Sequence, residues 1–458
     1  MRRGPLGQSS TARSGGTLGA IGLALLLIAS TAWMLAIRTN PPPPPPRLHE
    51  MTRTVGWRAL PWREQNEKRI TSLKNCLSAR NCRERQEQVV ILVSYHFVYA
   101  LQGSTSGENI WANSMFDSVE DLGYTYLIGE SYEDLVPLYN QYPSRVKVVI
   151  TMMDWVPKCL HDEQCIRSDK FPQGIPLWQM IVFEWWRGAH HPLGHAWTLS
   201  PEDWEDGDVY LGYSVQRSCY KNQYIPHAKR KNRAVVLAKR VTYFYKPSYP
   251  WLGVDYANPP ATAAAALGEG FEFVGAARND TAYGWDNGDN RVDNPVVPAG
   301  INPLTQGEGE NLSKEQWFLE LADTRVMVGI GQPYVSPSPW DALCLGVPFI
   351  NPVMVWDRSN PENRSAWTTQ HDGLRYEPEP RVYHILEVED MAERTKMFWE
   401  AVTRAMTTPI ERYIAPSRTP DAVRERFYHI VMADWRQKAV EWRQERISKG
   451  EEVIEFDF

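Results

Sequence analysis

Short apolar runs alternate with helical stretches through most of the chain, and this alternation limits the fold more than any other feature. Residues 88–97, 124–129 and 146–155 each read as a buried strand, and stretches with helical character separate them. Short apolar runs that are joined by helical segments indicate βαβ units, whose strands pair in parallel. We therefore expect an α/β fold with parallel sheets.

A second block of the same kind begins near residue 234. Its predicted strands are 234–241, 271–276, 325–331 and 347–352, and its predicted helices are 261–270, 311–323 and a helix from about Trp340. Residues 160–230 read as loops and irregular helices, 278–311 as a long surface loop, and the tail from Glu389 as helices. Two such blocks predict two Rossmann-like domains, whose ligands bind beyond the carboxyl ends of the strands in the cleft between them.

A membrane anchor is predicted near the N-terminus. Leu18 to Ile37 form an uncharged run of twenty residues, and about 20 apolar residues span a bilayer core as a helix. Arg2, Arg3 and Arg13 precede the run without any acidic residue, so the rest of the chain is expected in the lumen. The alternative is a cleavable signal peptide, whose apolar region is shorter, at roughly 7–15 residues, and ends in small residues. The run here ends in Met-Leu-Ala-Ile, which favours an anchor.

Six consecutive prolines follow the predicted anchor, at positions 41–46. Such a run forms a stiff rod, which suits a stem that holds a lumenal body off the membrane. Sequons at Asn279, Asn311 and Asn363 also fit a lumenal body. The predicted organisation is a cytoplasmic tail at 1–17, an anchor at 18–37, a proline-rich stem at 38–87, an N-terminal Rossmann-like domain at 88–230, a C-terminal Rossmann-like domain at 231–405 and terminal helices at 406–458.

Charge and cysteine content narrow the class of protein further. The net charge is −6 although the first forty residues hold four arginines and no acid, so the body is acidic and a nucleic-acid partner is not expected. Of the six cysteines, Cys76 lies close to Cys82 and Cys159 close to Cys165. In a lumenal protein this spacing favours disulfides, with free thiols as the alternative, and the lack of any CxxC pair argues against zinc. The connectivity stays open.

The segment from Val326 to Pro352 carries the strongest functional signal. It reads as a strand, a tight glycine- and proline-rich loop, and a helix that starts near Pro339, because proline suits the first helical turn. The N-terminus of such a helix offers free N–H groups and a positive dipole end to a diphosphate. Asp341 in the first turn is placed to accept ribose hydroxyls. The alternative is an ordinary strand-loop-helix connection in which Asp341 only caps the helix.

This segment resembles the family 18 glycosyltransferases, the N-acetylglucosaminyltransferase V family. The matching residues are Val328-Gly329-Ile330-Gly331, Pro333-Tyr334, Pro337, Pro339, Asp341 and Phe349-Ile350-Asn351-Pro352, with further similarity at 312–326, 368–371 and 410–416. The resemblance covers most of residues 311–435. It implies the GT-B architecture, in which two Rossmann-like domains face a cleft. It also implies a Golgi transferase that uses UDP-N-acetylglucosamine as donor and requires no metal.

A weaker resemblance extends into the first half of the chain, at 105–128, 197–204, 211–216 and 235–244. By that match Glu108, at the start of the first helix, corresponds to the catalytic base of the family. Lys239 corresponds to a lysine that follows a strand of the second domain. The resemblance thus implies Glu108 as the catalytic residue, no metal ligands, and a donor site made of Lys239, Gly331, Pro333, Tyr334, Pro337, Pro339 and Asp341.

Two positions depart from the family pattern. Val335 stands where the family has a glutamate after Pro-Tyr, and Asp341 stands where it has a second glutamate. The chain also lacks the long stem domain and the cysteine-rich extension of the animal enzymes. A related GT-B transferase with another donor or acceptor is therefore an alternative, and an inactive membrane-tethered sugar-binding protein is another.

The expected reaction is an inverting transfer of N-acetylglucosamine, in beta-1,6 linkage, to a mannose of a glycoprotein N-glycan. Glu108 would take the proton of a primary mannose hydroxyl, which attacks C1 of the donor sugar. The helix N-terminus near Trp340 and the ammonium of Lys239 would stabilise the departing diphosphate. Without the resemblance, Glu108 reads first as a solvated glutamate that the helix dipole favours.

Two other polar groups carry less weight. Asp206-Gly207-Asp208 resembles a metal-binding DxD pair, but it lies in the acidic run 202–208 with no strand directly before it, so a turn is expected. His190, His191 and His195 form a small cluster, in which a proline and a glycine break any helical spacing. A metal site is therefore not expected there. No serine-hydrolase or P-loop motif occurs.

Overall fold

The computed structural model describes residue 58 and residues 60–104, 106–278, 295–304 and 312–457. The chain divides into two compact units, Met1–Leu60 and Pro61–Phe458. The predicted anchor at 18–37, the proline run at 41–46 and the sequons at Asn279 and Asn311 lie outside the described residues. Within the described part, no helix combines the length and the apolar character needed to cross a membrane.

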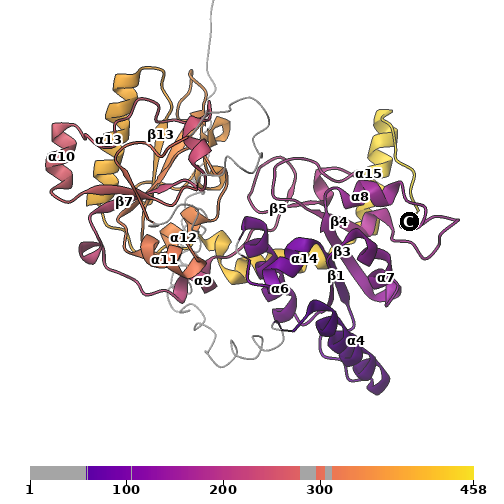
Figure 1. The fold of residues 1–458 in the computed structure, drawn as a ribbon. Coiled ribbons are helices and arrows are strands. Elements are labelled where there is room, and N and C mark those ends of the chain that lie inside the picture. Colours follow the sequence, from indigo (N-terminus) through magenta and orange to yellow (C-terminus); the bar gives the residue numbers. More distant parts are fainter. Residues whose placement is uncertain (1–57, 59, 105, 279–294, 305–311, 458) are drawn as a thin grey trace, which may run out of the picture. The chain divides into compact units, whose positions relative to one another are not determined.

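The second unit is an α/β structure with two sheets whose strands are mostly parallel (Figure 1). In the first sheet the strand order is β2-β1-β3-β4-β5-β6, and every neighbouring pair is parallel. The strands are β1 Val89–Val93, β2 Thr125–Gly129, β3 Val146–Met152, β4 Met180–Phe183, β5 Thr198–Ser200 and β6 Val209–Tyr210. Strands β1, β2 and β4 are buried along their whole length, as expected where helices cover both faces of a parallel sheet.

The first half differs from the sequence prediction in four places. The strand predicted at 146–155 ends at Met152, and helix α8 begins at Trp155. The strand predicted at 88–97 ends early, because the Ser94 hydroxyl accepts the His96 N–H at 3.1 Å and so caps a helix. The predicted stem contains a helix that packs on the sheet, where the Asn66 side chain donates to the Ile128 carbonyl at 2.7 Å. Residues 160–230 hold three strands as well as loops. The helices of this half are α4 Trp62–Ala79, α5 Tyr95–Leu101, α6 Gly107–Asp121, α7 Leu135–Tyr139, α8 Trp155–Leu160 and α9 Gln216–Tyr220.

The second sheet has the strand order of a Rossmann fold. Its path is β9-β8-β7-β10-β11, with β13 parallel to β11 and the short β12 antiparallel to it. The strands are β7 Arg233–Leu237, β8 Glu272–Gly275, β9 Ile301–Pro303, β10 Val326–Gly329, β11 Phe349–Val355, β12 Thr368–Thr369 and β13 Val382–Leu386. Without β12, the strands taken in chain order give 3-2-1-4-5-6, in which the order reverses between β7 and β10.

The helices of the second half follow local signals in the sequence. The helix predicted at 311–323 is present as α11 and starts with a capping box, in which the Ser313 hydroxyl accepts the Gln316 N–H at 3.2 Å and the Gln316 side chain accepts the Ser313 N–H at 2.7 Å. The helix expected from about Trp340 begins two residues earlier, at Ser338. These helices are α10 Ala261–Leu267, α11 Lys314–Ala322, α12 Ser338–Cys344 and α13 Met391–Thr407.

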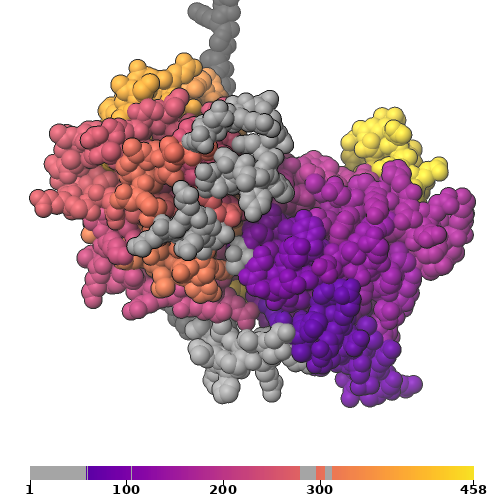
Figure 2. Space-filling model, in the orientation of Figure 1, coloured from indigo at the N-terminus to yellow at the C-terminus, as the bar shows by residue number. Residues whose placement is uncertain are grey.

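The C-terminal helices return to the first half. Helix α14, Pro420–Met432, lies beside α6 (Figure 1), and the Arg426 side chain donates to the Leu211 carbonyl at 2.8 Å. Helix α15, Trp435–Lys449, lies on the surface of the first half, in yellow in Figure 2. Residues from about 416 onward therefore complete the first half.

All six cysteines are paired, which confirms the expectation of disulfides. Cys76 pairs with Cys82 and Cys159 with Cys165, each across six positions. The third bond joins Cys219 of α9 to Cys344 of α12, 125 positions apart. It ties the crossover between the two halves to the helix that follows the predicted donor loop.

Candidate functional site

The predicted site residues lie where the strand order of each sheet reverses. Open α/β sheets bind ligands at such points, outside the carboxyl ends of the strands. In the second sheet, Lys239 follows β7 and the loop from Ile330 to Pro337 follows β10, and these strands are neighbours at the reversal. In the first sheet the reversal lies between β1 and β3, and Glu108 lies on the connection that follows β1.

The loop after β10 has a backbone that only particular residues can adopt. Gly331 has φ +83°, and a Cβ there would lie 2.8 Å from the Ser248 carbonyl oxygen. The peptide bond between Gln332 and Pro333 is cis. Val335 is buried with φ 47°, a conformation that β-branched residues rarely adopt and that concentrates at functional sites. The backbone of this loop therefore differs from that of an ordinary strand-to-helix connection, because two of its residues, Gly331 and Val335, have positive φ.

Gln370, directly after β12, holds this loop in place. Its side-chain oxygen accepts the Gly331 N–H at 2.9 Å, and its side-chain nitrogen donates to the Pro333 carbonyl at 3.3 Å. Its backbone carbonyl accepts the Val335 N–H at 2.8 Å. Three points of the loop thus depend on one buried residue, which the sequence analysis did not select as a site residue.

Tyr334 joins the loop to the first half of the molecule. Its hydroxyl donates a hydrogen bond to the Asp372 carboxylate. Its ring is stacked against Trp186 and Trp204, with centroid distances of 6.4 Å and 6.3 Å and interplanar angles of 11° and 9°. Because Trp186 follows β4 and Trp204 follows β5, loops from both sheets meet at Tyr334.

The start of α12 gives a mixed result for the predicted donor site. Pro337 is the N-cap residue and Pro339 lies in the first turn, so the helix starts where the sequence predicts, and the donor-binding role of both prolines stays a prediction. The helix has only seven residues. Asp341 is 5% exposed, and burial raises the pKa of its carboxyl to about 7. A ribose could reach this carboxylate only after a local rearrangement. Lys239 is exposed, in contrast.

Glu108 lies in the first turn of α6, half-buried, within an acidic group of residues. Burial raises the pKa of the Tyr95 hydroxyl, and the carboxylates of Glu108 and Glu184 raise it further. Burial also raises the pKa of Glu184, and the negative charge of Glu108 adds to this rise. The Glu184 carboxylate accepts the Trp186 N–H at 3.0 Å. Glu184 was not predicted; the only signal for it is the short apolar run 180–183 that ends directly before it.

Two adjacent tryptophans connect Glu108 to the loop after β10. A Cβ on Gly107 would lie 2.6 Å from the Trp185 ring, so the start of α6 rests on that ring. Trp186, the next residue, is stacked against Tyr334. Gly107, the residue before Glu108, and Tyr334 therefore contact the same Trp185-Trp186 segment, one from each half.

A buried polar cluster supports the segment around Gln370. Arg418 forms an ion pair with Glu202, and the Tyr213 hydroxyl donates to Glu202 at 3.4 Å. His371 lies 3.8 Å from Glu202, and burial lowers its pKa to about 3, so its ring is neutral. These residues come from the β5–β6 loop, the segment after β6, the segment after β12 and the C-terminal tail. Glu202, Tyr213 and His371 lie in segments that the sequence resemblance covers, but their contacts could not be predicted, because they meet only in the folded chain.

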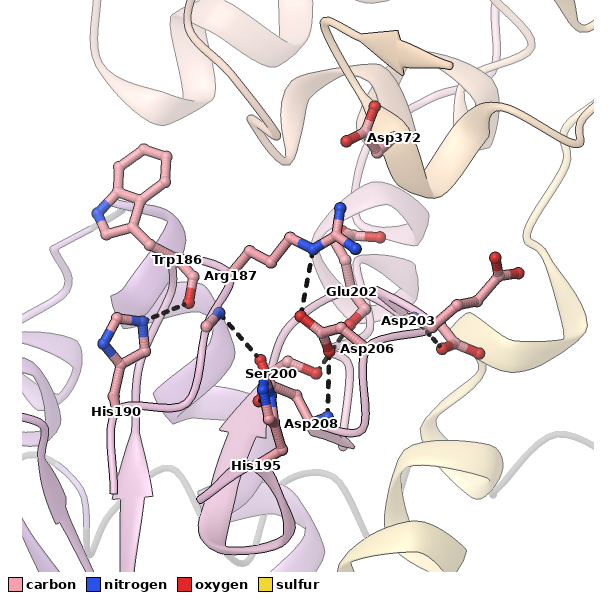
Figure 3. A network of polar contacts seen from close by, with 12 residues as sticks. Trp186, Arg187, His190, His195, Ser200, Glu202, Asp203, Asp206, Asp208 and Asp372 are labelled. Atoms are coloured by element: carbon pink, nitrogen blue, oxygen red, sulfur yellow. Dashed lines mark hydrogen bonds and ion pairs between the residues drawn. The ribbon is translucent and has the colours of Figure 1, made fainter. Parts of the chain in front are cut away.

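The predicted turn at Asp206-Gly207-Asp208 is present between β5 and β6. Of the three histidines, only His195 approaches it, with Nδ1 2.8 Å from an Asp208 carboxylate oxygen (Figure 3). His190 instead contacts the Trp186 carbonyl at 3.1 Å, and His191 is buried. The structure therefore brings together two groups that the sequence analysis treated separately.

Searches against protein-family models and curated proteins gave no match to this chain. The function is therefore inferred from the fold, the residues at the two points of strand reversal and the sequence resemblance.

Proposed function

We propose that the protein is an inverting GT-B glycosyltransferase that transfers N-acetylglucosamine from UDP-N-acetylglucosamine, in beta-1,6 linkage, to a mannose of a glycoprotein N-glycan. One observation supports this most strongly. Loops from the carboxyl ends of both parallel sheets meet where Trp186 is stacked against Tyr334, with carboxylates on one side and the glycine-proline loop on the other.

The donor would bind at the reversal point of the second sheet. Gly331, with φ +83° and no room for a Cβ beside the Ser248 carbonyl, would let the loop take the shape that holds the diphosphate. The Lys239 ammonium and the first N–H groups of α12 would carry the positive charge that a departing diphosphate needs. Tyr334 and Gln370 would keep this loop in one conformation, so that little reorganisation accompanies the reaction.

The acceptor would bind on the side of Glu108. Its carboxylate would take the proton of the mannose hydroxyl while the hydroxyl oxygen forms a bond to C1 of the donor sugar. The bond from C1 to the diphosphate oxygen breaks in the same displacement, UDP leaves, and the configuration at C1 is inverted. Burial, with the nearby Glu108 carboxylate, raises the pKa of Glu184, so Glu184 takes up a proton more readily than a solvated glutamate does.

A lumenal location agrees with the disulfides and with the sequon among the described residues. Three disulfides fit an oxidising compartment. The sequon at Asn363 ends in an exposed serine, so this site lies at the surface. We propose a single-pass type II protein of the Golgi membrane, anchored by residues 18–37.

The proposal is tested with the full-length chain in nonionic detergent, first without a chelator and then with EDTA, because no metal is proposed to take part in the transfer step. A panel of UDP-sugars is offered with mannose-rich and biantennary N-glycans, and products are identified by mass and linkage. The panel covers several sugars because Val335, which replaces a glutamate of the family pattern, is buried and presents no carboxylate to a donor. Transfer of N-acetylglucosamine to a mannose is expected. Absence of transfer from every donor would contradict the proposal and leave only a sugar-binding role.

Glu108→Gln tests the base directly. Loss of a general base typically lowers kcat by about 10²–10⁴-fold, while UDP binding should stay unchanged because Glu108 lies on the acceptor side. Glu67→Gln, on the exposed face of α4, is the matched control and should retain full activity. Glu184→Gln separates the two carboxylates. Greater loss in Glu184→Gln than in Glu108→Gln would transfer the base role to Glu184.

A further inference from the structure

Two loops of the first half bring three metal-ligating side chains together. His195 comes from the β4–β5 loop, and Asp206 and Asp208 come from the β5–β6 loop. One potential ligand atom of each residue lies within 4.8 Å of those of the other two. Figure 3 shows the His195 ring beside Asp208, with Asp206 directly above. The cluster thus combines one imidazole and two carboxylates from separate segments.

The exposure of the three side chains is graded. The Asp208 side chain is 1% exposed and that of His195 is 41% exposed, while Asp206, at 13%, lies between them. An ion could therefore enter from solvent on the His195 side and meet the buried carboxylate at the far end. Water would complete its coordination on the open side, as in metal sites with three protein ligands.

The buried carboxylate has little positive charge around it. One oxygen of Asp208 faces His195 Nδ1 at 2.8 Å, and the other accepts the Gly188 N–H at 3.3 Å. Arg187 is bound to Asp206 at 3.2 Å, and its own side chain is 54% exposed. Asp206 adds a second negative charge beside Asp208. Burying a carboxylate is costly unless it is paired or coordinates a metal, and a divalent ion would supply the missing charge.

We propose that His195, Asp206 and Asp208 bind one divalent transition-metal ion, of the Mn²⁺ or Zn²⁺ type. Imidazole favours transition metals over Ca²⁺ and Mg²⁺, whereas carboxylates accept both kinds, so the mixed set selects the former. The site does not rest on the proposed transferase activity, and the ion takes no part in the transfer step.

The ion would connect two loops that carry the aromatic contacts to the second half. Trp186 directly precedes Arg187 in the first loop, and Trp204 lies two residues before Asp206 in the second. Both rings are stacked against Tyr334. Binding the two loops to one ion would hold both tryptophans at fixed spacing, so the site is structural.

The test uses the full-length chain in nonionic detergent after dialysis against a chelator and removal of the chelator. Isothermal titration with MnCl2, ZnCl2, CaCl2 and MgCl2 measures stoichiometry and affinity. We expect one ion per chain for Mn²⁺ or Zn²⁺, with affinity at least about 10-fold above that for Ca²⁺ and Mg²⁺. Binding of Ca²⁺ or Mg²⁺ as tightly would contradict the assignment to a transition metal.

Variants locate the site. Asp206→Asn, Asp208→Asn and His195→Gln should each weaken binding by at least about 10-fold, since even outer-shell partners change metal affinity by about 10–100-fold. Asp203→Asn, in the same loop and exposed, and His190→Gln are matched controls and should bind as the unaltered chain does. Arg187→Met removes a competing cation and should strengthen binding.

Two results would overturn the proposal: no binding below millimolar metal, or binding that the three ligand variants leave unchanged. If Asp208→Asn fails to fold, Asp206→Asn gives the same test at a more exposed position. UDP stabilisation is recorded for each variant in parallel. Because that readout belongs to the donor site, failure of the metal site and failure of the proposed transferase can be told apart.

Discussion

Replacement of Gln370 by glutamate should make the stability of the donor loop depend on pH. Gln370 is 1% exposed, and its side chain both accepts the Gly331 N–H and donates to the Pro333 carbonyl. A protonated glutamate can make both hydrogen bonds, whereas a carboxylate can only accept. Above its pKa, Gln370→Glu therefore loses one hydrogen bond and also buries a charge beside a carbonyl oxygen.

The magnitude follows from these two contacts. Burial raises the pKa of a glutamate in the folded state above the unfolded value of about 4.3. The stability contributed by the protonated form is then fully present below the unfolded pKa and is lost as pH rises through the folded pKa. We expect a deficit under about 1 kcal/mol near pH 4.5, which grows to roughly 2–4 kcal/mol at pH 8, from one lost hydrogen bond and one unpaired buried charge.

Urea unfolding of the full-length chain, followed by tryptophan fluorescence at several pH values, measures this deficit. Gln370→Ala is the matched variant, because it leaves the buried Gly331 N–H without its partner and should cost roughly 1–3 kcal/mol at every pH. A Gln370→Glu deficit that is the same from pH 4.5 to pH 8 would refute the hydrogen-bonding role assigned to Gln370.

Two further predictions concern Asp341 and the disulfides. Asp341→Asn should stabilise the protein increasingly between about pH 4 and pH 7, by roughly 2–4 kcal/mol at the upper end. Burial raises the folded pKa of Asp341 to about 7, so the unaltered protein loses stability as pH rises through that value. Urea unfolding at pH 5 and pH 8 measures the gain in the free energy of unfolding, and equal gains at both pH values would contradict the prediction. Replacing Cys219 and Cys344 together by serine should lower the free energy of unfolding by about 5 kcal/mol, and replacing Cys76 and Cys82 should lower it by about 2–3 kcal/mol. The difference is expected because the Cys219–Cys344 bond closes a much longer loop than the Cys76–Cys82 bond. Equal losses in urea unfolding would argue against loop closure as the cause.

The main elements of the fold could be predicted from the sequence where strands were long and apolar. Strands β1, β2 and β3 and the cap of α11 follow from runs of branched residues and from Ser313 with Gln316. Strands β5 and β6 have three and two residues, which is too short for any period to be recognised. The strand at 88–97 was predicted too long, because a serine cap overrides the apolar run that continues beyond it.

In the candidate site, too, some positions could be predicted from the sequence and others could not. The positions of Glu108 and Gly331 could be predicted, because each follows a strand and precedes a helix along the chain. The roles of Gln370, Glu184 and Arg418 could not, because each acts on partners that are distant in sequence. Gln370 contacts Gly331 across 39 positions, and Arg418 contacts Glu202 across 216. Burial of Asp341 was also missed, since the sequence shows a first-turn acid but not what covers it.

Amide hydrogen exchange of the full-length chain with and without UDP shows whether a nucleotide diphosphate binds at the reversal point between β7 and β10, at the loop after Gly331. We expect UDP to slow exchange in peptides covering residues 330–345 and 238–241, in Glu108→Gln as well as in the unaltered chain. Protection confined to other segments, or none in these two, would contradict this expectation.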